Sequence, residues 1–191
     1  IEDLWSYHCA RMAEFGFDRV IYGFSRLAKL HDLSSPEGFI VLSNHPASYT
    51  QGFINGLRYQ NSPMFLWALD NAGASSWREA AVLAERIGCP AHEVLAFNAA
   101  HGVIAGYTVS LHAHGTPSQG VVSLTAAHGL SQDDADAIWA EHGRTIIGMN
   151  SIAHLKLTCL PQPSQRSLTP RQREVLEWVG QGKTTQDIAV I

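Results

Sequence analysis

The spacing of hydrophobic residues changes along the chain between the period of a helix and the period of a strand. A repeat every three or four residues predicts helices at 4–15, 47–59, 77–87, 91–101 and from Ser131 to about 157. Short runs rich in β-branched and aromatic residues predict strands at 19–25, 39–42, 103–112 and 121–127. The loop at 115–120 is rich in glycine, so it predicts a hairpin between the last two strands.

Capping residues mark where several of these helices begin and end. Ser76 and Glu79 have the spacing of a capping box for the helix that ends at Gly88, and Ser131 opens the long helix. Strands and helices are interspersed, and the last two strands form a hairpin. We therefore expect an α/β (α+β) fold, an antiparallel sheet sandwiched between helix layers, rather than a doubly wound parallel sheet.

The composition and the hydrophobic pattern of the chain change near residue 158. Residues 158–167 contain two prolines and no hydrophobic period, which predicts an interdomain linker between a domain at 1–157 and a second at 168–191. Thr169 and Pro170 then mark the start of a short helix, and Thr184 caps another. The second domain should therefore begin with two short helices.

Composition and charge narrow the class of protein. Hydrophobic residues make up 46% of the chain and charged residues 16%, as in a globular protein, and no apolar run is long enough to span a bilayer. We expect a cytoplasmic location. The net charge of −4 argues against a polyanion binder, yet four basic residues gather near the end, which indicates a separate nucleic-acid-facing module: Arg166, Arg171, Arg173 and Lys183.

The three cysteines and two strand histidines were considered as sites of metal or redox chemistry. Cys9, Cys89 and Cys159 lie too far apart for a metal or redox motif, so we expect buried free thiols. His112 and His114 could point the same way on a strand, but no third ligand follows nearby, and zinc prefers four. We expect no metal and no other cofactor beyond a small signal molecule.

The last segment closely resembles the beginning of the LuxR-family DNA-binding domain. The resemblance rests on residues 168–178, 182–184 and 187–189, where caps, glycine, lysine and apolar stripe coincide. It implies that five residues form the scaffold of a helix-turn-helix domain: Glu174, Leu176, Gly182, Lys183 and Thr184. The family's recognition helix comes later and is absent from this chain, so we expect only the full protein to read DNA.

The first domain resembles the autoinducer-binding domain of LuxR-family quorum-sensing regulators, which recognise acyl-homoserine lactones. The similarity is clearest at residues 44–49 and continues through Phe53, Ser62–Pro63 and Trp77. Gly102, Gly106, Gly120 and Ser123 fall where the family has late glycines and a strand hydroxyl. The resemblance implies a ligand between the sheet and one helix layer, and a homodimer that binds two DNA half-sites.

Three ligand-binding residues are implied by the family's motif. Trp77 matches a tryptophan that packs beside the lactone ring. Tyr49 lies where the family usually has a tryptophan that donates to the lactone carbonyl, and His45 lies where a tyrosine often contacts the acyl carbonyl. A tyrosine hydroxyl can donate as an indole does, but with a different reach.

Three further positions complete the implied ligand-binding set. Phe53 replaces a tyrosine and lacks its hydroxyl, and Ser123 provides a strand hydroxyl. Ser62 lies where the family nearly always has an aspartate that accepts the ligand's amide proton, and a neutral acceptor makes a weaker hydrogen bond. Asn61 could substitute if the loop shifts. The changes concentrate in the polar half of the site, which indicates the same fold with a changed ligand.

Each of these positions also has a purely structural interpretation. Tyr49, Phe53 and Trp77 have the spacing of ordinary core residues, and His45 could be a turn residue before a proline. Ser62 could be a helix N-cap before Pro63. Ser123 could lie on the far face of the sheet.

Three hypotheses about function follow. The first is a ligand-responsive transcription regulator that senses a small amphiphilic signal, an acyl-homoserine lactone or a relative, and dimerises through Trp139 and Ile146 of the long helix. The second is a regulator of the same fold that senses a non-lactone ligand or none. The third is a small hydrolase of such a signal, which needs a nucleophile and a base. The sequence contains no Gly-x-Ser-x-Gly motif, so we expect no enzyme.

Overall fold

The computed structural model describes residues 1–25, 39–111, 119–160 and 169–190. The chain forms two compact units, Ile1–Cys159 and Leu160–Ile191. None of the helices in these described ranges is both long and apolar enough to cross a membrane.

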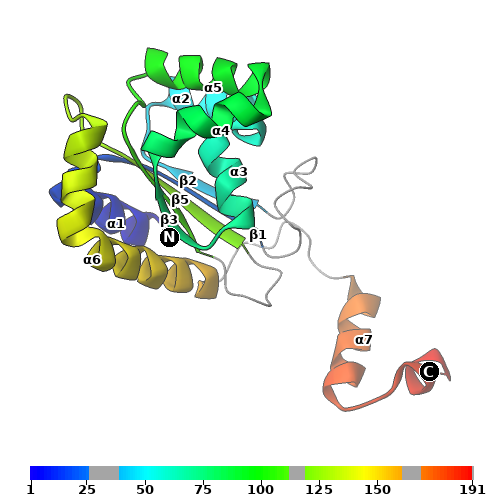
Figure 1. Cartoon of the computed structure of the whole chain (residues 1–191). Coiled ribbons are helices and arrows are strands. Elements are labelled where there is room, and N and C mark those ends of the chain that lie inside the picture. The colour runs from blue at the N-terminus through cyan, green and yellow to red at the C-terminus, as the bar shows by residue number, and fades with distance from the viewer. Residues whose placement is uncertain (26–38, 112–118, 161–168, 191) are drawn as a thin grey trace. The chain divides into compact units, whose positions relative to one another are not determined.

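A five-stranded antiparallel sheet forms the centre of the first unit (Figure 1). Its strands, in the order β2-β1-β5-β4-β3, are β1 (Arg19–Ser25), β2 (Phe39–Ser43), β3 (Gly73–Ser76), β4 (Gly106–Ser110) and β5 (Gln119–Thr125). The predicted strands are present, with β4 shorter than expected. The sequence did not predict β3, because its four small residues have no apolar alternation and pair only with β4 at the sheet edge.

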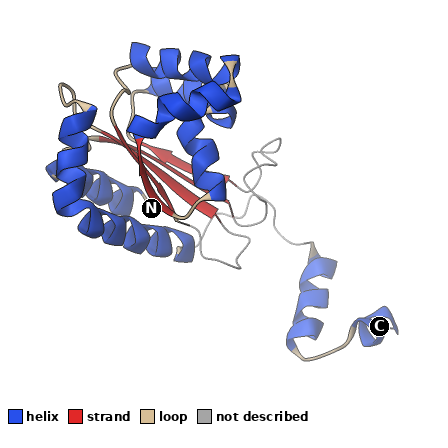
Figure 2. Ribbon diagram, in the orientation of Figure 1, coloured by secondary structure: helices blue, strands red, loops and turns tan. Residues whose placement is uncertain are grey.

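Helices cover both faces of this sheet, which confirms the predicted sandwich (Figures 1 and 2). One layer consists of α1 (Glu2–Glu14) and α6 (Gln132–Cys159). The other contains α2 (Ala47–Thr50), α3 (Pro63–Asp70), α4 (Ala80–Ile87) and α5 (Cys89–Ala100). Sheets covered on both faces bury both sets of side chains, as β4 does along its whole length.

The alternation of side chains along β1 separates two hydrophobic clusters. Val20 and Tyr22 pack with Met12 of α1 and Ile146 of α6 in the larger cluster. Ile21, which points to the opposite face, packs instead in a smaller aromatic cluster under α2 and α5. The candidate site lies on this second face.

The segment between β2 and α3 departs from the predicted single helix. It contains α2, a π-helical turn (Gln51–Asn55) and a 3-10 helix (Arg58–Asn61). A Cβ on Gly52 would lie 2.6 Å from the Phe97 ring, and Leu57 has a positive φ of 55°. The segment around Gly52 therefore departs from regular α-helix and lies close to α5.

The predicted caps are largely present. The Ser76 hydroxyl accepts from the Arg78 amide at 3.2 Å, at the start of a 3-10 turn (Trp77–Glu79) that precedes α4. The partner of Ser76 is therefore the amide of Arg78 and not that of Glu79, which the predicted capping box requires. Ser131 and Asp134 exchange hydrogen bonds at the start of α6. The short polar side chains thus set these helix starts, as the sequence indicated.

The structure contradicts the prediction that Ile146 of α6 is available for a dimer contact. Ile146 has no exposed surface, and the Trp139 ring stacks on Tyr107 of the sheet at 4.0 Å between ring centroids. Ile146 therefore belongs to the core of the first unit, and Trp139 is partly buried against that core. The apolar residues that α6 exposes are Ile152 and Leu155, each 61% exposed.

The second unit contains α7 (Pro170–Gly180) and α8 (Thr185–Val190). Thr169 and Gln172 form the predicted capping box, and Thr184 and Asp187 exchange hydrogen bonds at the start of α8. The remaining predicted scaffold residues lie between or on these helices. Gly182 has a positive φ of 81°, and the backbone amide of Lys183 donates to the carbonyl oxygen of Trp178. On α7, the Glu174 carboxylate accepts from Arg171, and the Leu176 side chain is 55% exposed.

The expectation about the cysteines holds in part. All three are free and Cys9 is buried, but Cys89 and Cys159 are exposed. Within the described ranges, no group of three or more His, Cys, Asp or Glu side chains is placed to hold a metal ion. His112 and His114 lie outside the described residues.

Candidate functional site

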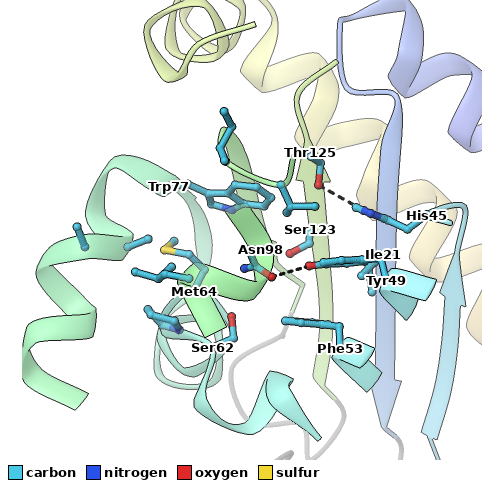
Figure 3. Close-up of a pocket in the computed structure, with 16 residues that line it drawn as sticks. Ile21, His45, Tyr49, Phe53, Ser62, Met64, Trp77, Asn98, Ser123 and Thr125 are labelled. Carbon is cyan, nitrogen blue, oxygen red and sulfur yellow. Dashed lines mark hydrogen bonds between the residues drawn. The ribbon is translucent and has the colours of Figure 1, made fainter. Parts of the chain in front are cut away.

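A cavity of about 240 Å³ lies between the sheet and the α2–α5 layer (Figure 3). Its walls come from β1, β5, α3, α4, α5 and the segments around α2. None of its described lining residues is an aspartate, glutamate, lysine or arginine. The lining residues are Ile21, His45, Tyr49, Phe53, Ser62, Pro63, Met64, Trp77, Ala80, Ala81, Leu95, Asn98, Val103, Ile104, Ser123 and Thr125.

All six residues predicted to bind the ligand lie on the walls of this cavity: His45, Tyr49, Phe53, Ser62, Trp77 and Ser123. They come from four separate segments of the chain, 45–53 and the neighbourhoods of Ser62, Trp77 and Ser123, so the fold brings them together. Ser123 faces the cavity rather than the far side of the sheet. Contact with a ligand stays a prediction for each of them.

Tyr49 is the centre of an aromatic stack. Its ring lies nearly parallel to His45 at 4.6 Å, to Phe53 at 5.4 Å and to Phe97 at 5.5 Å between ring centroids. The hydroxyl of Tyr49 donates to Oδ1 of Asn98 at 3.0 Å. Burial raises the pKa of this hydroxyl, so it stays protonated and neutral.

His45 is buried beside this stack with one ring nitrogen satisfied. Its Nε2 lies 3.3 Å from the Thr125 hydroxyl, while Nδ1 is fully buried and finds no partner among the described residues. Burial, together with the nearby charge of Arg19, lowers the pKa of His45 to about 4. The imidazole is therefore neutral at pH 7, and the site carries no net charge from this side chain.

The indole of Trp77 forms another wall. Its Nε1 donates to the hydroxyl of Thr108 on β4 at 2.9 Å. The residues on both sides of Trp77 are bonded to Asp136 of α6: Ser76 donates at 2.8 Å, and Arg78 Nε donates at 3.0 Å. These bonds hold the tryptophan against the sheet from outside the cavity.

Ser62 and Ser123 contribute hydroxyl groups. Ser62 occupies the N-cap position of α3, but its side chain makes no capping hydrogen bond. Ser123 on β5 lies beside Ile21 of β1 and Thr108 of β4. Both serines are neutral groups that can donate or accept.

Sequence reasoning missed Asn98 and Thr125, whose side chains bond to the predicted residues Tyr49 and His45. Asn98 follows Leu95 by three positions on α5, so both share one helix face. A lone amide among apolar residues on that face was the available signal. For Thr125 the sequence contained no signal other than its position two residues after Ser123 in the same strand.

The buried histidines predict a pH dependence of stability. Because the folded pKa of His45 is about 4 and the unfolded value is 6.5, the unfolded chain binds the extra proton first as the pH falls. Stability should therefore drop between pH 6.5 and 4, by about 2 kcal/mol at pH 5 for this residue. Burial also lowers the pKa of His8 and His154, which adds to the same slope.

Urea denaturation at pH 7 and pH 5 measures this effect. His45→Phe removes the titrating group and keeps a ring against Tyr49. The variant should lose less stability than the original protein on acidification. An equal loss in both proteins would contradict the assignment to His45.

Comparison with known families and proteins identifies the fold. Residues 1–157 match the family described as "Autoinducer binding domain", and residues 166–191 match "Bacterial regulatory proteins, luxR family". The chain belongs to the LuxR-type regulators with an autoinducer-binding domain. The resemblance inferred from the sequence is thereby confirmed, and the matching families and relatives are transcription regulators rather than enzymes.

Individual relatives agree with this family. The chain is 35% identical to the quorum sensing-dependent transcriptional regulator RpaR of Rhodopseudomonas palustris over 104 residues, which are 53% of this chain and 39% of RpaR. The structure of SdiA in complex with octanoyl-rac-glycerol matches with a TM-score of 0.61 at 15% identity, over 99% of this chain and 73% of SdiA. The N-acylhomoserine lactone-dependent factor CepR2 of Burkholderia cenocepacia matches with a TM-score of 0.58 at 14% identity, over 81% of this chain and 84% of CepR2.

Proposed function

We propose that this chain is the sensing part of a ligand-responsive transcription regulator and that a small neutral amphiphile binds in the 240 Å³ cavity. The cavity carries this proposal, because protein domains are close-packed and this hollow, which is partly open to solvent, reaches between the sheet and the helix layer. An unfilled cavity lowers stability in proportion to its volume. A ligand that fills it would complete the second hydrophobic cluster.

The lining supports an amphiphile rather than a charged ligand. Apolar and aromatic side chains surround a few neutral polar groups, and a charged ligand would find no opposite charge among the described lining residues. The Nδ1 of His45 has no partner among the described residues, and native proteins rarely leave a buried polar atom without a protein, water or ligand partner. An acyl-homoserine lactone or a relative fits this description.

The volume favours a short acyl chain. A cavity of about 240 Å³ corresponds to roughly eight water molecules in the liquid. An engineered cavity of about 150 Å³ is known to bind benzene, so this one accepts a somewhat larger molecule. Butanoyl and hexanoyl derivatives should bind better than dodecanoyl ones.

Thermal unfolding with a panel of ligands tests the proposal. A ligand that binds only the folded chain, at about a hundred times its dissociation constant, stabilises it by about 2.7 kcal/mol. For a chain of this length that is a rise in Tm of roughly 5–10 °C. The panel should contain acyl-homoserine lactones and monoacylglycerols with short and long chains. No rise with any of them would contradict the proposal.

Two matched variants show whether the cavity is the binding site. Ala80 lines the cavity on α4, and Ala80→Leu should fill part of it and reduce the ligand-induced rise in Tm. Ala99 is exposed on α5, and Ala99→Leu should leave the rise unchanged. Equal effects of the two substitutions would place the ligand elsewhere.

In the full protein the sensor would control DNA binding as a dimer in the cytoplasm. LuxR-type regulators carry a helix-turn-helix domain, and dimers of such domains read paired half-sites. Ile152 and Leu155, exposed on α6, are the apolar residues available there for a contact between subunits. Sedimentation of the full protein with and without ligand measures the assembly.

A regulator of the same fold that senses a non-lactone ligand is the second candidate. The observation that favours it is the hydroxyl of Ser62, which stands where the family resemblance implies an aspartate. The SdiA structure contains octanoyl-rac-glycerol, so this fold holds a ligand other than a lactone in that protein. Mass spectrometry of small molecules that co-purify from the native host distinguishes the two candidates.

A further inference from the structure

Two aromatic residues that the family resemblance places beside the ligand already use their hydrogen-bond donors within the protein. The indole N–H of Trp77 donates to Thr108, and the hydroxyl of Tyr49 donates to Asn98. Either bond would have to break before its donor could reach a ligand. The donor for a ligand in this cavity must therefore come from another residue.

Asn98 has a side-chain donor that Tyr49 leaves free. Because Oδ1 accepts from Tyr49, the amide nitrogen is the free end of the side chain, and it lies on the side of Trp77 (Figure 3). The residues that the structure describes provide no hydrogen-bond acceptor for this nitrogen. A primary amide carries two N–H groups, so the cavity contains a neutral double donor whose orientation Tyr49 determines.

A strong acceptor is missing from the same walls. The described lining contains no carboxylate, and its other polar groups are neutral: the hydroxyls of Ser62, Ser123 and Thr125 and the imidazole of His45. An amide N–H on a ligand would meet only a neutral acceptor, and a neutral acceptor makes a bond about half as strong as a charged one. An amide in the ligand thus gains little here, and an unpaired N–H would lose its water without replacement.

From this asymmetry, we propose that Asn98, oriented by Tyr49, is the donor that binds the ligand's carbonyl or hydroxyl oxygen, and that the cavity selects neutral oxygen-rich ligands without requiring an amide. The preferred class is an acyl ester or acyl ketone with a short apolar chain. This inference rests on the proposed function, because it assumes that a small molecule occupies the cavity. It adds the residue that recognises the ligand and the chemical class that this residue favours.

The experiment compares two matched ligands on the chain as it exists. One is a butanoyl amide of an aminolactone, and the other is the butanoyl ester of the corresponding hydroxylactone, which replaces the amide N–H by oxygen. Butanoyl glycerol is the third probe. Dissociation constants come from isothermal titration with the original protein, Asn98→Ala, Ser62→Asp and Glu93→Ala. Glu93 is exposed on the same helix as Asn98 and provides the control for a substitution in α5.

The original protein should bind the ester at least as tightly as the amide. Asn98→Ala should weaken binding of the ester and of the glycerol derivative about fivefold, the effect of one neutral hydrogen bond, while Glu93→Ala changes neither. Ser62→Asp introduces a carboxylate and should shift the preference towards the amide. The melting temperature of each unliganded variant shows whether it is folded.

Two results would overturn this inference and leave the proposed function intact: amide binding about tenfold tighter than ester binding in the original protein, or ester binding unchanged in folded Asn98→Ala. Absence of binding by all three probes would overturn both. The outcomes therefore separate the recognition chemistry from the sensing role.

Discussion

Replacing Gly106 by alanine is expected to cause the largest loss of stability, about 3 kcal/mol or more. Gly106 begins β4 with a φ of +155°, and a Cβ there would lie 2.1 Å from the carbonyl oxygen of Leu124 on β5. Because both atoms belong to paired backbone strands, neither can move without disturbing the sheet. Urea denaturation measures the loss, and a large effect would appear as insoluble protein on expression.

Gly148 is the matched control for this substitution. It lies in α6, and a Cβ built on it meets nothing within 4 Å. Gly148→Ala should stabilise the protein by about 0.5–1 kcal/mol, because alanine restricts the unfolded chain and favours helix. Equal destabilisation by both substitutions would show that the close approach at β4 is not the cause.

The second large effect is expected for Asp136→Ala, a loss of about 2–3 kcal/mol. The Asp136 carboxylate accepts from Ser76, Tyr107 and Gln132 at 2.8 Å and from Arg78 Nη2 at 2.7 Å. Removing it leaves these donors unpaired and releases both residues that flank Trp77. Ligand binding should therefore weaken together with stability, which thermal unfolding with and without ligand measures.

Asp133 provides the control for Asp136. It also pairs with Arg78, but its side chain is 85% exposed. Exposed pairs contribute little, so Asp133→Ala should change stability by about 0.5 kcal/mol or less. Similar losses of stability from the two substitutions would mean that the ion pairs of Arg78, rather than the hydrogen bonds to Asp136, stabilise this region of the fold.

The pH behaviour of Asp136 differs from that of His45. Burial alone would raise the pKa of this carboxyl, but the hydrogen bonds from Gln132, Arg78, Ser76 and Tyr107 lower it to about 2. Its contribution to stability is therefore present above pH 3.8 and is lost as the pH falls towards 2. As the pH falls, the free energy of unfolding should therefore decrease over two pH ranges, the first because His45 is protonated in the unfolded chain and the second because Asp136 is.

Local signals in the sequence were sufficient for most elements of the fold. The hydrophobic periods identified α1, α6 and the strands β1, β2, β4 and β5, since each pattern reflects burial of one face or both. Capping residues such as Thr169 and Ser131 set helix starts within a few neighbouring positions. The family motif also nominated six residues that all line the one cavity described here.

Contacts between distant segments decided the rest. β3 exists because β4 offers it an edge to pair with, and Trp139 packs against the core because its ring stacks on Tyr107. In the same way, Tyr49 was predicted as a donor to ligand, but the partner of its hydroxyl is Asn98, 49 residues away. No local pattern encodes such pairs.

The sequence by itself therefore determined most of the elements, several of the helix starts and the family to which the chain belongs. The tertiary structure alone decided which polar groups remain free to meet a ligand. Short-range periodicity and capping depend on neighbouring residues. The free hydrogen-bonding groups depend on which side chains from separate elements satisfy one another when the sheet and helices pack.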